Sequence, residues 1–148
     1  MIQHYVIDTC SLISYFNRVF DESQKISTRA RRIIGQAFHS FPQDVKLSIP
    51  SIVFVEIFEK WITTDEFAAK FHYEVFQLVI QSPNIEIKPI EREVLDNLLL
   101  IGDSMSGHEI HDKIILASAM MLDCPLITID TKIIDYVDKH RVIPRIVS

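Results

Sequence analysis

The chain has 148 residues, with 20 acidic and 15 basic side chains and therefore a formal net charge of -5. This length is enough for one domain that buries most of its apolar surface without a disulfide or zinc staple. Hydrophobic residues make up 48% of the sequence and charged residues 24%, a composition that excludes an intrinsically disordered chain. The acidic balance also argues against a general nucleic-acid-binding protein, which usually carries an excess of basic side chains.

The sequence contains two cysteines, Cys10 and Cys124, and no CxxC pair. Two cysteines in a chain of this length do not make a disulfide framework, and the missing CxxC pair excludes a zinc ribbon. The first residues show no basic segment followed by a long apolar run, and no apolar stretch approaches the length of a membrane span. We therefore expect a protein of the reducing cytoplasm that has no membrane partner.

Apolar and amphipathic segments alternate along the chain and indicate strands and helices in turn. In chain order we expect a strand at 4–7, helices at 11–16 and 23–38, a strand at 45–49, helices at 50–62 and 64–80, a strand at 85–88, helices at 91–101 and 110–122, a strand at 125–129, a helix at 132–137 and a last strand at 141–143. Strands separated by helices are typical of a parallel sheet with helices on both faces. The predicted fold class is α/β, a three-layer α/β/α sandwich with a central, mostly parallel sheet. We expect a single domain over 1–148, with a helical hairpin at 50–80.

Two acids directly follow predicted strands. Asp8 comes after the strand that ends at Ile7, and Asp130 comes after the strand that ends at Ile129. In open α/β sheets, functional sites form beyond the carboxyl ends of the strands. For either acid alone, a helix cap or a turn is the better interpretation.

Two further acids lie inside apolar helical segments. Glu56 lies in the apolar run 51–58, where an acid must be paired, bound to a metal or placed near the end of the sheet. A salt bridge to Lys60, four positions further on, is the simpler alternative. Asp112 begins the buried stripe of the helix at 110–122, and an acid in a first helical turn is also favoured by the helix dipole alone.

Taken together, these acids predict a metal site. Four carboxylates from four separate segments repel one another at one sheet edge unless they share protons or cations. No spacing of His or Cys ligands is present, so zinc is a poor candidate. An all-oxygen site instead indicates Mg²⁺ or Mn²⁺.

The four acids lie in four motifs that are spread over nearly the whole chain. The motifs are Tyr5-Val6-Ile7-Asp8-Thr9-Cys10-Ser11-Leu12-Ile13, then Ser51 with Glu56, then His111-Asp112-Lys113-Ile114-Ile115-Leu116-Ala117-Ser118-Ala119, and finally Leu126-Ile127-Thr128-Ile129-Asp130. In order and approximate spacing, this set resembles the acidic motifs of the PIN-domain family. In size the chain is similar to stand-alone PIN proteins, of which VapC-type toxins are the largest group.

The resemblance implies a PIN-like fold and a metal-dependent endoribonuclease, which hydrolyses RNA phosphodiester bonds with Mg²⁺ or Mn²⁺. It implies that Asp8, Glu56, Asp112 and Asp130 are the catalytic and metal-binding residues. It also implies the toxin of a type II toxin–antitoxin pair, blocked by a small antitoxin protein with a basic side chain in the acidic pocket. Because the family often dimerises through such helices as the hairpin at 50–80, a homodimer is a further expectation.

Five other residues are expected close to the carboxylates. We expect Cys10, Thr128 and His111 to support them; the family often has Ser or Asn at the Cys10 position, and a thiol is a weaker hydrogen-bond partner. A capping or packing role is an equal alternative for His111. Lys113 and Arg18 are candidate RNA contacts, against the simpler interpretation of solvated surface charges.

Other enzyme classes fit the sequence less well. A haloacid-dehalogenase-like phosphotransferase needs a second acid two positions after Asp8, where the chain has Cys10. A cysteine phosphatase would need an Arg six positions after Cys10, where the chain has Phe16. The alternative that remains is a PIN-like RNA- or protein-binding module with weak or no catalysis.

The acidic net charge is compatible with an RNA substrate. Four of the acids are the expected metal ligands, and bound cations would offset their charge locally. The remaining acidic and basic side chains nearly balance. This balance favours a selective, metal-bridged contact over tight binding driven by charge alone.

Overall fold

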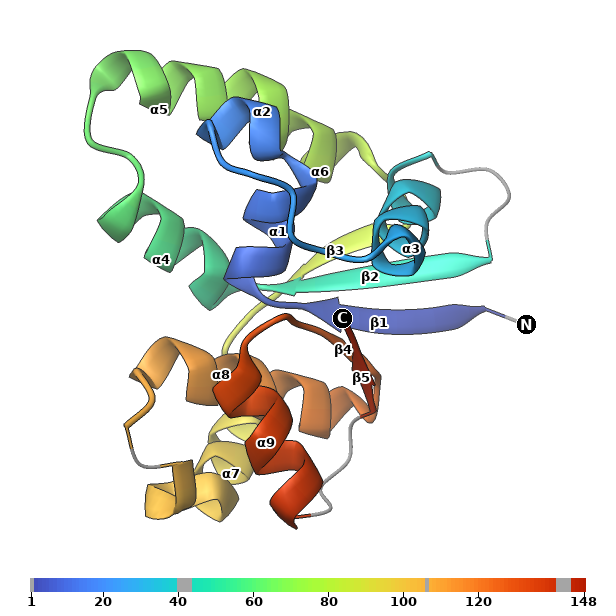
Figure 1. Ribbon diagram of the computed structural model, residues 1–148, viewed down its shortest axis with the longest axis vertical. Helices are drawn as coiled ribbons and strands as arrows, with labels where there is room; N and C mark the ends of the chain where they lie inside the picture. The colour runs from blue at the N-terminus through green and yellow to red at the C-terminus, as the bar shows by residue number, and fades with distance from the viewer. Residues whose placement is uncertain (1, 40–43, 106, 141–144) are drawn as a thin grey trace.

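The computed structural model describes residues 2–39, 44–105, 107–140 and 145–148 and shows one sheet of five strands (Figure 1). The strands are β1 (Gln3–Ile7), β2 (Val45–Pro50), β3 (Ile85–Lys88), β4 (Leu126–Ile127) and β5 (Ile146–Val147). They are ordered β3-β2-β1-β4-β5, and every pairing is parallel. Central β1 pairs on one side with β2, where Tyr5 lies opposite Leu47, and on the other with β4, where Val6 lies opposite Leu126.

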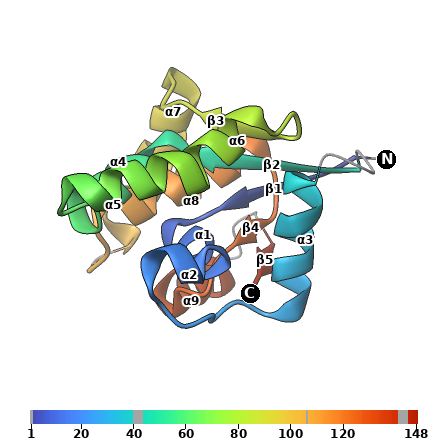
Figure 2. The same ribbon diagram turned by 90° about the horizontal axis from the view of Figure 1, so that it is seen from above.

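Helices connect the strands and cover both faces of the sheet. They are α1 (Thr9–Tyr15), α2 (Asn17–Phe20), α3 (Thr28–Phe38), α4 (Ser51–Lys60), α5 (Asp65–Phe71), the π-helical turn η1 (His72–Phe76), α6 (Gln77–Gln81), α7 (Arg92–Ile101), the 3-10 turn η2 (Gly102–Met105), α8 (Ile110–Leu122) and α9 (Thr131–His140). In Figure 2, α4 to α8 lie on one face of the sheet and α1, α2, α3 and α9 on the other. The predicted α/β/α sandwich is confirmed. None of the described helices is long and apolar enough to cross a membrane.

The central strands are buried on both faces because their sequences are apolar almost without interruption. Val6, Ile7, Leu47, Ile49 and Ile127 are all fully buried. Side chains on neighbouring positions of a strand point to opposite faces, so each of these strands contributes to the core on both sides of the sheet. Because both faces are buried, the positions of the strand ends are well defined, and so are the positions of the residues that follow them.

The carboxyl ends of β1, β2 and β4 lie at one edge of the sheet because the three strands are parallel. Helices α1, α4 and α9 begin at this edge (Figure 1). The backbone N–H of Ser11 donates to Oδ1 of Asp8 at 2.9 Å, so Asp8 caps α1. Oδ1 of Asp130 accepts hydrogen bonds from the backbone N–H groups of Lys132, at 2.9 Å, and Ile133, at 3.3 Å. Capping by these two acids is therefore real, and it holds both carboxylates at the edge.

Helix α3 begins later than the apolar periodicity predicts, at Thr28 instead of residue 23. Oγ of buried Ser14 accepts hydrogen bonds from the backbone N–H groups of Lys25, at 2.7 Å, and Ile26, at 3.1 Å. These contacts hold the preceding segment against α1. Ser27 then caps α3 through the backbone N–H of Ala30, at 3.1 Å.

Other boundaries also differ from the predicted ones. The helix expected at 64–80 spans α5, η1 and α6, with a π-helical turn in its middle, and the short helix α2 was not predicted. The strand expected at 125–129 is limited to Leu126–Ile127. The strand expected at 141–143 lies outside the described residues, and the last strand observed is β5.

We predict that Ser14→Ala lowers the free energy of unfolding by about 1–3 kcal/mol, because it leaves two backbone N–H groups without their acceptor. Urea denaturation measures this change. Ser23→Ala, at an exposed position of the same segment, is the control and should change stability by less than about 0.5 kcal/mol. Equal losses in the two variants would contradict the role given to Ser14.

Candidate metal centre

Asp8 is the most enclosed of the four acids, with 3% of its surface exposed. Its Oδ2 accepts a hydrogen bond from Oγ1 of fully buried Thr128 at 2.5 Å, and its Oδ1 caps α1. Burial raises the pKa of Asp8 to about 6; the hydrogen bonds from Thr128 and Ser11 lower it, and the nearby charge of Asp130 raises it further. Burial outweighs the hydrogen bonds, so the charged form of this carboxyl is destabilised.

Asp130 is half-buried at the turn between β4 and α9. Its backbone N–H donates to Oγ1 of Thr128 at 3.0 Å, so one threonine hydroxyl contacts both Asp8 and Asp130. The sequence analysis predicted a supporting role for Thr128, and the structure places it between these two acids. Thr128, which directly follows β4, therefore helps to position both acids.

Asp112 lies in the first turn of α8 and is half-buried. Burial raises its pKa to about 6, and the charges of Asp130 and Glu56 add to the increase. Two of the other predicted ligands are therefore close enough to Asp112 to destabilise its charged form. This is the electrostatic pattern expected where carboxylates meet without a cation.

Glu56 lies on α4 and has 9% of its surface exposed. Its Oε2 accepts a hydrogen bond from Nζ of Lys60 at 3.1 Å, as the simpler interpretation of the sequence predicted. The same oxygen lies 4.0 Å from Nδ1 of His111. Glu56 is thus the predicted ligand whose carboxylate pairs with a lysine side chain.

The environment of Cys10 includes all four predicted acids. Its pKa is raised to about 12, first by partial desolvation of the thiol and then by the negative charges of Asp8, Glu56, Asp112 and Asp130, although the residue as a whole is exposed. One thiol thus lies within electrostatic reach of all four predicted carboxylates. The thiol is protonated at neutral pH and is not a nucleophile there.

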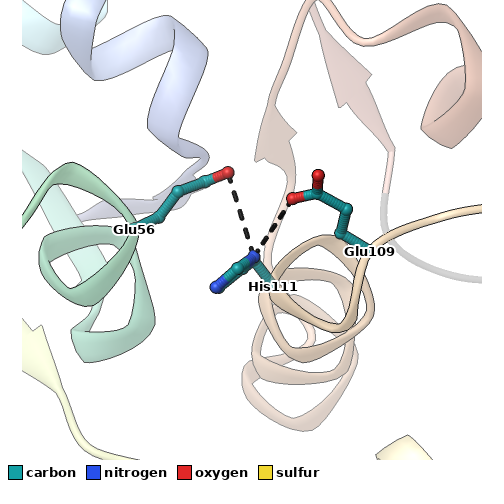
Figure 3. Close-up of side chains that lie close together, drawn as sticks. All are labelled: Glu56, Glu109 and His111. Carbon is teal, nitrogen blue, oxygen red and sulfur yellow. Dashed lines mark hydrogen bonds and ion pairs between the residues drawn. The ribbon is translucent and has the colours of Figure 1, made fainter. Parts of the chain in front are cut away.

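A tighter group of donors lies beside the four acids, where α4 faces the start of α8. Ligand atoms of Glu56, Glu109 and His111 all lie within 4.8 Å of one another, so these residues could hold a metal ion. Figure 3 shows both carboxylates directed at the imidazole ring, with Nδ1 of His111 3.2 Å from Oε2 of Glu109. Of the predicted acids, only Glu56 belongs to this group, which is the one such group among the residues that the structure describes.

Sequence reasoning missed Glu109 and gave no His a ligand role. The pair Glu109 and His111 comes from the start of α8, and Glu56 comes from α4, so no spacing within one segment reveals the group. Nζ of Lys60 donates to Oε2 of Glu109 at 2.5 Å as well as to Glu56. In this structure the lysine ammonium bridges the two carboxylates.

The two candidate RNA contacts have other neighbours. Nζ of Lys113 is 3.4 Å from the carbonyl oxygen of Gly102, at the end of α7. Arg18 is exposed on α2, where it lines a surface hollow with Tyr15 and Arg31. A contact of either residue with RNA stays a prediction.

Neither a protein-family model nor a curated protein matches this sequence. Solved structures match it over nearly its whole length, and the fold they share is the PIN-like α/β/α sandwich. VapBC2 from Rickettsia felis, bound to a DNA fragment from its promoter, matches with a TM-score of 0.62 and 13% identity over 99% of this chain and 98% of that chain.

Two further matches are similar in extent. FitAcB from Neisseria gonorrhoeae has a TM-score of 0.58 and 16% identity, over 97% of this chain and 96% of that chain. A toxin–antitoxin complex from Klebsiella pneumoniae has a TM-score of 0.54 and 20% identity over the same shares. At these identities the matches show a common fold, and the predicted resemblance to PIN domains is confirmed at that level.

The raised pKa values of Asp8 and Asp112 determine how stability should depend on pH without metal. Both carboxyls have a pKa of about 6 in the folded chain and an ordinary value of 3.8. Between about pH 4 and pH 6 the folded chain therefore binds more protons than the unfolded chain. Its free energy of unfolding falls as the pH rises through that window.

We predict that Asp112→Asn removes the part of this decrease in the free energy of unfolding that is caused by Asp112. In EDTA at about pH 7.5 the variant should be more stable than wild type by on the order of 1 kcal/mol, since half-burial and solvent screening reduce the effect. Near pH 4 the difference should approach zero. Urea denaturation at both pH values measures it, with Asp96→Asn on the exposed face of α7 as the control. A variant that is no more stable than wild type at the higher pH would contradict the raised pKa of Asp112.

Proposed function

We propose that this chain is a metal-dependent endoribonuclease that acts as the toxin of a toxin–antitoxin pair. The observation that carries the proposal is that Asp8 and Asp130, at the carboxyl edge of a parallel sheet, are joined through Thr128. The charges of these two acids and of Glu56 and Asp112 all raise the pKa of the Cys10 thiol, which supports a common site. The PIN-like fold, shared with solved toxin–antitoxin structures, supports it.

The residues present fit a hard divalent cation. The four predicted ligands offer only carboxylate oxygens, which Mg²⁺ and Mn²⁺ prefer. The raised pKa values of Asp8 and Asp112 mean that a bound cation would relieve repulsion already present in the folded chain. In this proposal Asp8, Asp112 and Asp130 hold the cation, and Glu56 binds it directly or through water.

A bound cation would lower the pKa of a water molecule and offset the charge of the scissile phosphodiester. Water adds to phosphorus and the P–O3′ bond breaks; the leaving 3′ oxygen takes up a proton, so the products carry a 5′-phosphate and a 3′-hydroxyl. The protein orients the site: Thr128 fixes Asp8 and the turn before Asp130, and Lys60 fixes Glu56. The closely placed carboxylates keep free RNA away until a cation is present.

The expected partners follow from the charge of the pocket. An RNA strand is the substrate, and a small antitoxin protein would block the pocket with a basic side chain that pairs with the carboxylates. The match to a toxin–antitoxin complex from Klebsiella pneumoniae supports such a partner. Both cysteines are free, as expected in the reducing cytoplasm. A homodimer belongs to the same proposal.

The alternative is a PIN-like binding module without catalysis. The ion pairs of Glu56 with Lys60 and of Lys60 with Glu109 favour it, because they occupy a predicted ligand with protein partners. A cation would have to displace Lys60 from Glu56 or bind through the other three acids. Cleavage assays distinguish the two functions.

We predict that Asp112→Asn reduces Mn²⁺-dependent cleavage of a fluorescently labelled RNA by more than about 100-fold. Replacing a residue that only hydrogen-bonds to a metal ligand typically costs about 10- to 100-fold in activity, and replacing the ligand itself should cost more. Gel electrophoresis of the products measures the rate, and EDTA should abolish it in wild type. Asp96→Asn, a second exposed acid-to-amide change, should keep the wild-type rate. Full activity of a folded Asp112→Asn preparation would overturn the mechanism.

The toxin role is tested in cells. Expression of the wild-type chain should arrest bacterial growth, and expression of Asp130→Asn at the same level should not. Co-expression of the open reading frame next to the gene should restore growth if that frame encodes the antitoxin. Growth arrest by Asp130→Asn equal to that by wild type would contradict a toxicity that depends on cleavage.

A further inference from the structure

A cavity of about 320 Å³ adjoins the proposed metal centre. Cys10 and Asp130 are among the residues that line it; Asp130 is a predicted metal ligand, and the charge of Asp130 acts on the Cys10 thiol. The cavity and the carboxylates therefore share a wall. A strand of RNA with its phosphodiester at the carboxylates would place its next nucleotide at the cavity.

The remaining walls are largely apolar and include one large aromatic ring. Ile13, Ile129 and Trp61 line the cavity. Trp61 is the only tryptophan of the chain and is half-buried at the end of α4. Its ring packs edge-on against Phe20, with centroids 5.8 Å apart and planes at 80°, and its backbone N–H donates to Ile57 at 2.9 Å. The indole is thus held in place by the core.

Polar groups lie around these apolar walls. Lys25 and Glu22, a basic and an acidic residue, are among those that line the cavity. An ammonium can pair with a backbone phosphate, and a carboxylate can accept hydrogen bonds from the amino groups of a base. The volume lies at the lower end of the range for small-ligand pockets, about 300–1,000 Å³, which suits one nucleoside rather than a longer segment.

We propose that this cavity binds the nucleobase next to the scissile phosphate, stacked on Trp61. The proposal deepens the proposed function and rests on it, because only an RNA held at the carboxylates brings a base to this position. Stacking tolerates every base, since each has a π-face. Trp61 therefore positions the substrate and does not touch the reacting atoms.

The fluorescence of Trp61 gives a direct test that needs no cleavage. AMP and UMP, titrated into the wild-type chain with MgCl₂, should quench its emission saturably, because stacking brings a base against the indole. Ribose 5-phosphate, which has the same sugar and phosphate but no base, should not quench it. N-acetyltryptophanamide under the same conditions corrects for absorption and collisional quenching.

Cleavage kinetics give the second test. Trp61→Leu, which keeps an apolar side chain without a π-face, should raise KM for RNA about 5-fold or more, with kcat changed less than about 2-fold. Trp61→Phe should retain a KM near that of wild type. Circular dichroism confirms that both variants fold.

The outcomes separate the two proposals. Saturable quenching by AMP and UMP, together with no detectable cleavage, would support the cavity as a base-binding site and overturn the nuclease. Absence of quenching would overturn base binding in this cavity, whether or not RNA is cleaved. A side chain of a partner protein would then be the better candidate occupant. Equal KM values for Trp61→Leu and Trp61→Phe would also overturn it.

Discussion

The fold buries carboxyl groups near one another, and the candidate site depends on the cost of their charged forms. Parallel strands buried on both faces end at one edge, so the residues after β1 and β4 meet there. Asp8 is held in this position by Thr128 and by the α1 backbone, although burial raises its pKa. Burial also raises the pKa of Asp112, and the charges of Asp130 and Glu56 add to the increase. A bound cation would stabilise the charged forms of these carboxyl groups, so the folded chain favours cation binding at this site.

The fold could be predicted from the sequence because its signals are local. Apolar runs separated by amphipathic helices indicate a parallel sheet, and the strand ends mark Asp8 and Asp130 directly. Glu56 and Asp112 were recognisable as acids on apolar stretches. Parallel topology places Asp8 and Asp130 at one edge because they follow β1 and β4. That all four acids form one site stays a prediction.

Contacts between separate segments could not be predicted. The start of α3 depends on a serine of α1, Ser14, which holds the backbone of residues 25 and 26. The bridge formed by Lys60 joins Glu56 on α4 to Glu109 before α8, and His111 completes that group. The sequence pattern of α4 does not indicate a contact with the start of α8, and the reverse is also true. Lys60 contacts Oε2 of Glu56, so a cation that binds this oxygen atom has to displace the ammonium group.

The most direct test of the central claim is the titration of the carboxyl groups themselves. ¹³C NMR of the Asp side-chain carboxyl carbons, recorded against pH in EDTA and again with saturating Mg²⁺, follows Asp8 and Asp112 individually. We predict midpoints near pH 6 in EDTA for both residues, and a decrease of more than about one pH unit with Mg²⁺, because a bound cation favours the charged form. Midpoints that Mg²⁺ leaves unchanged would contradict the account.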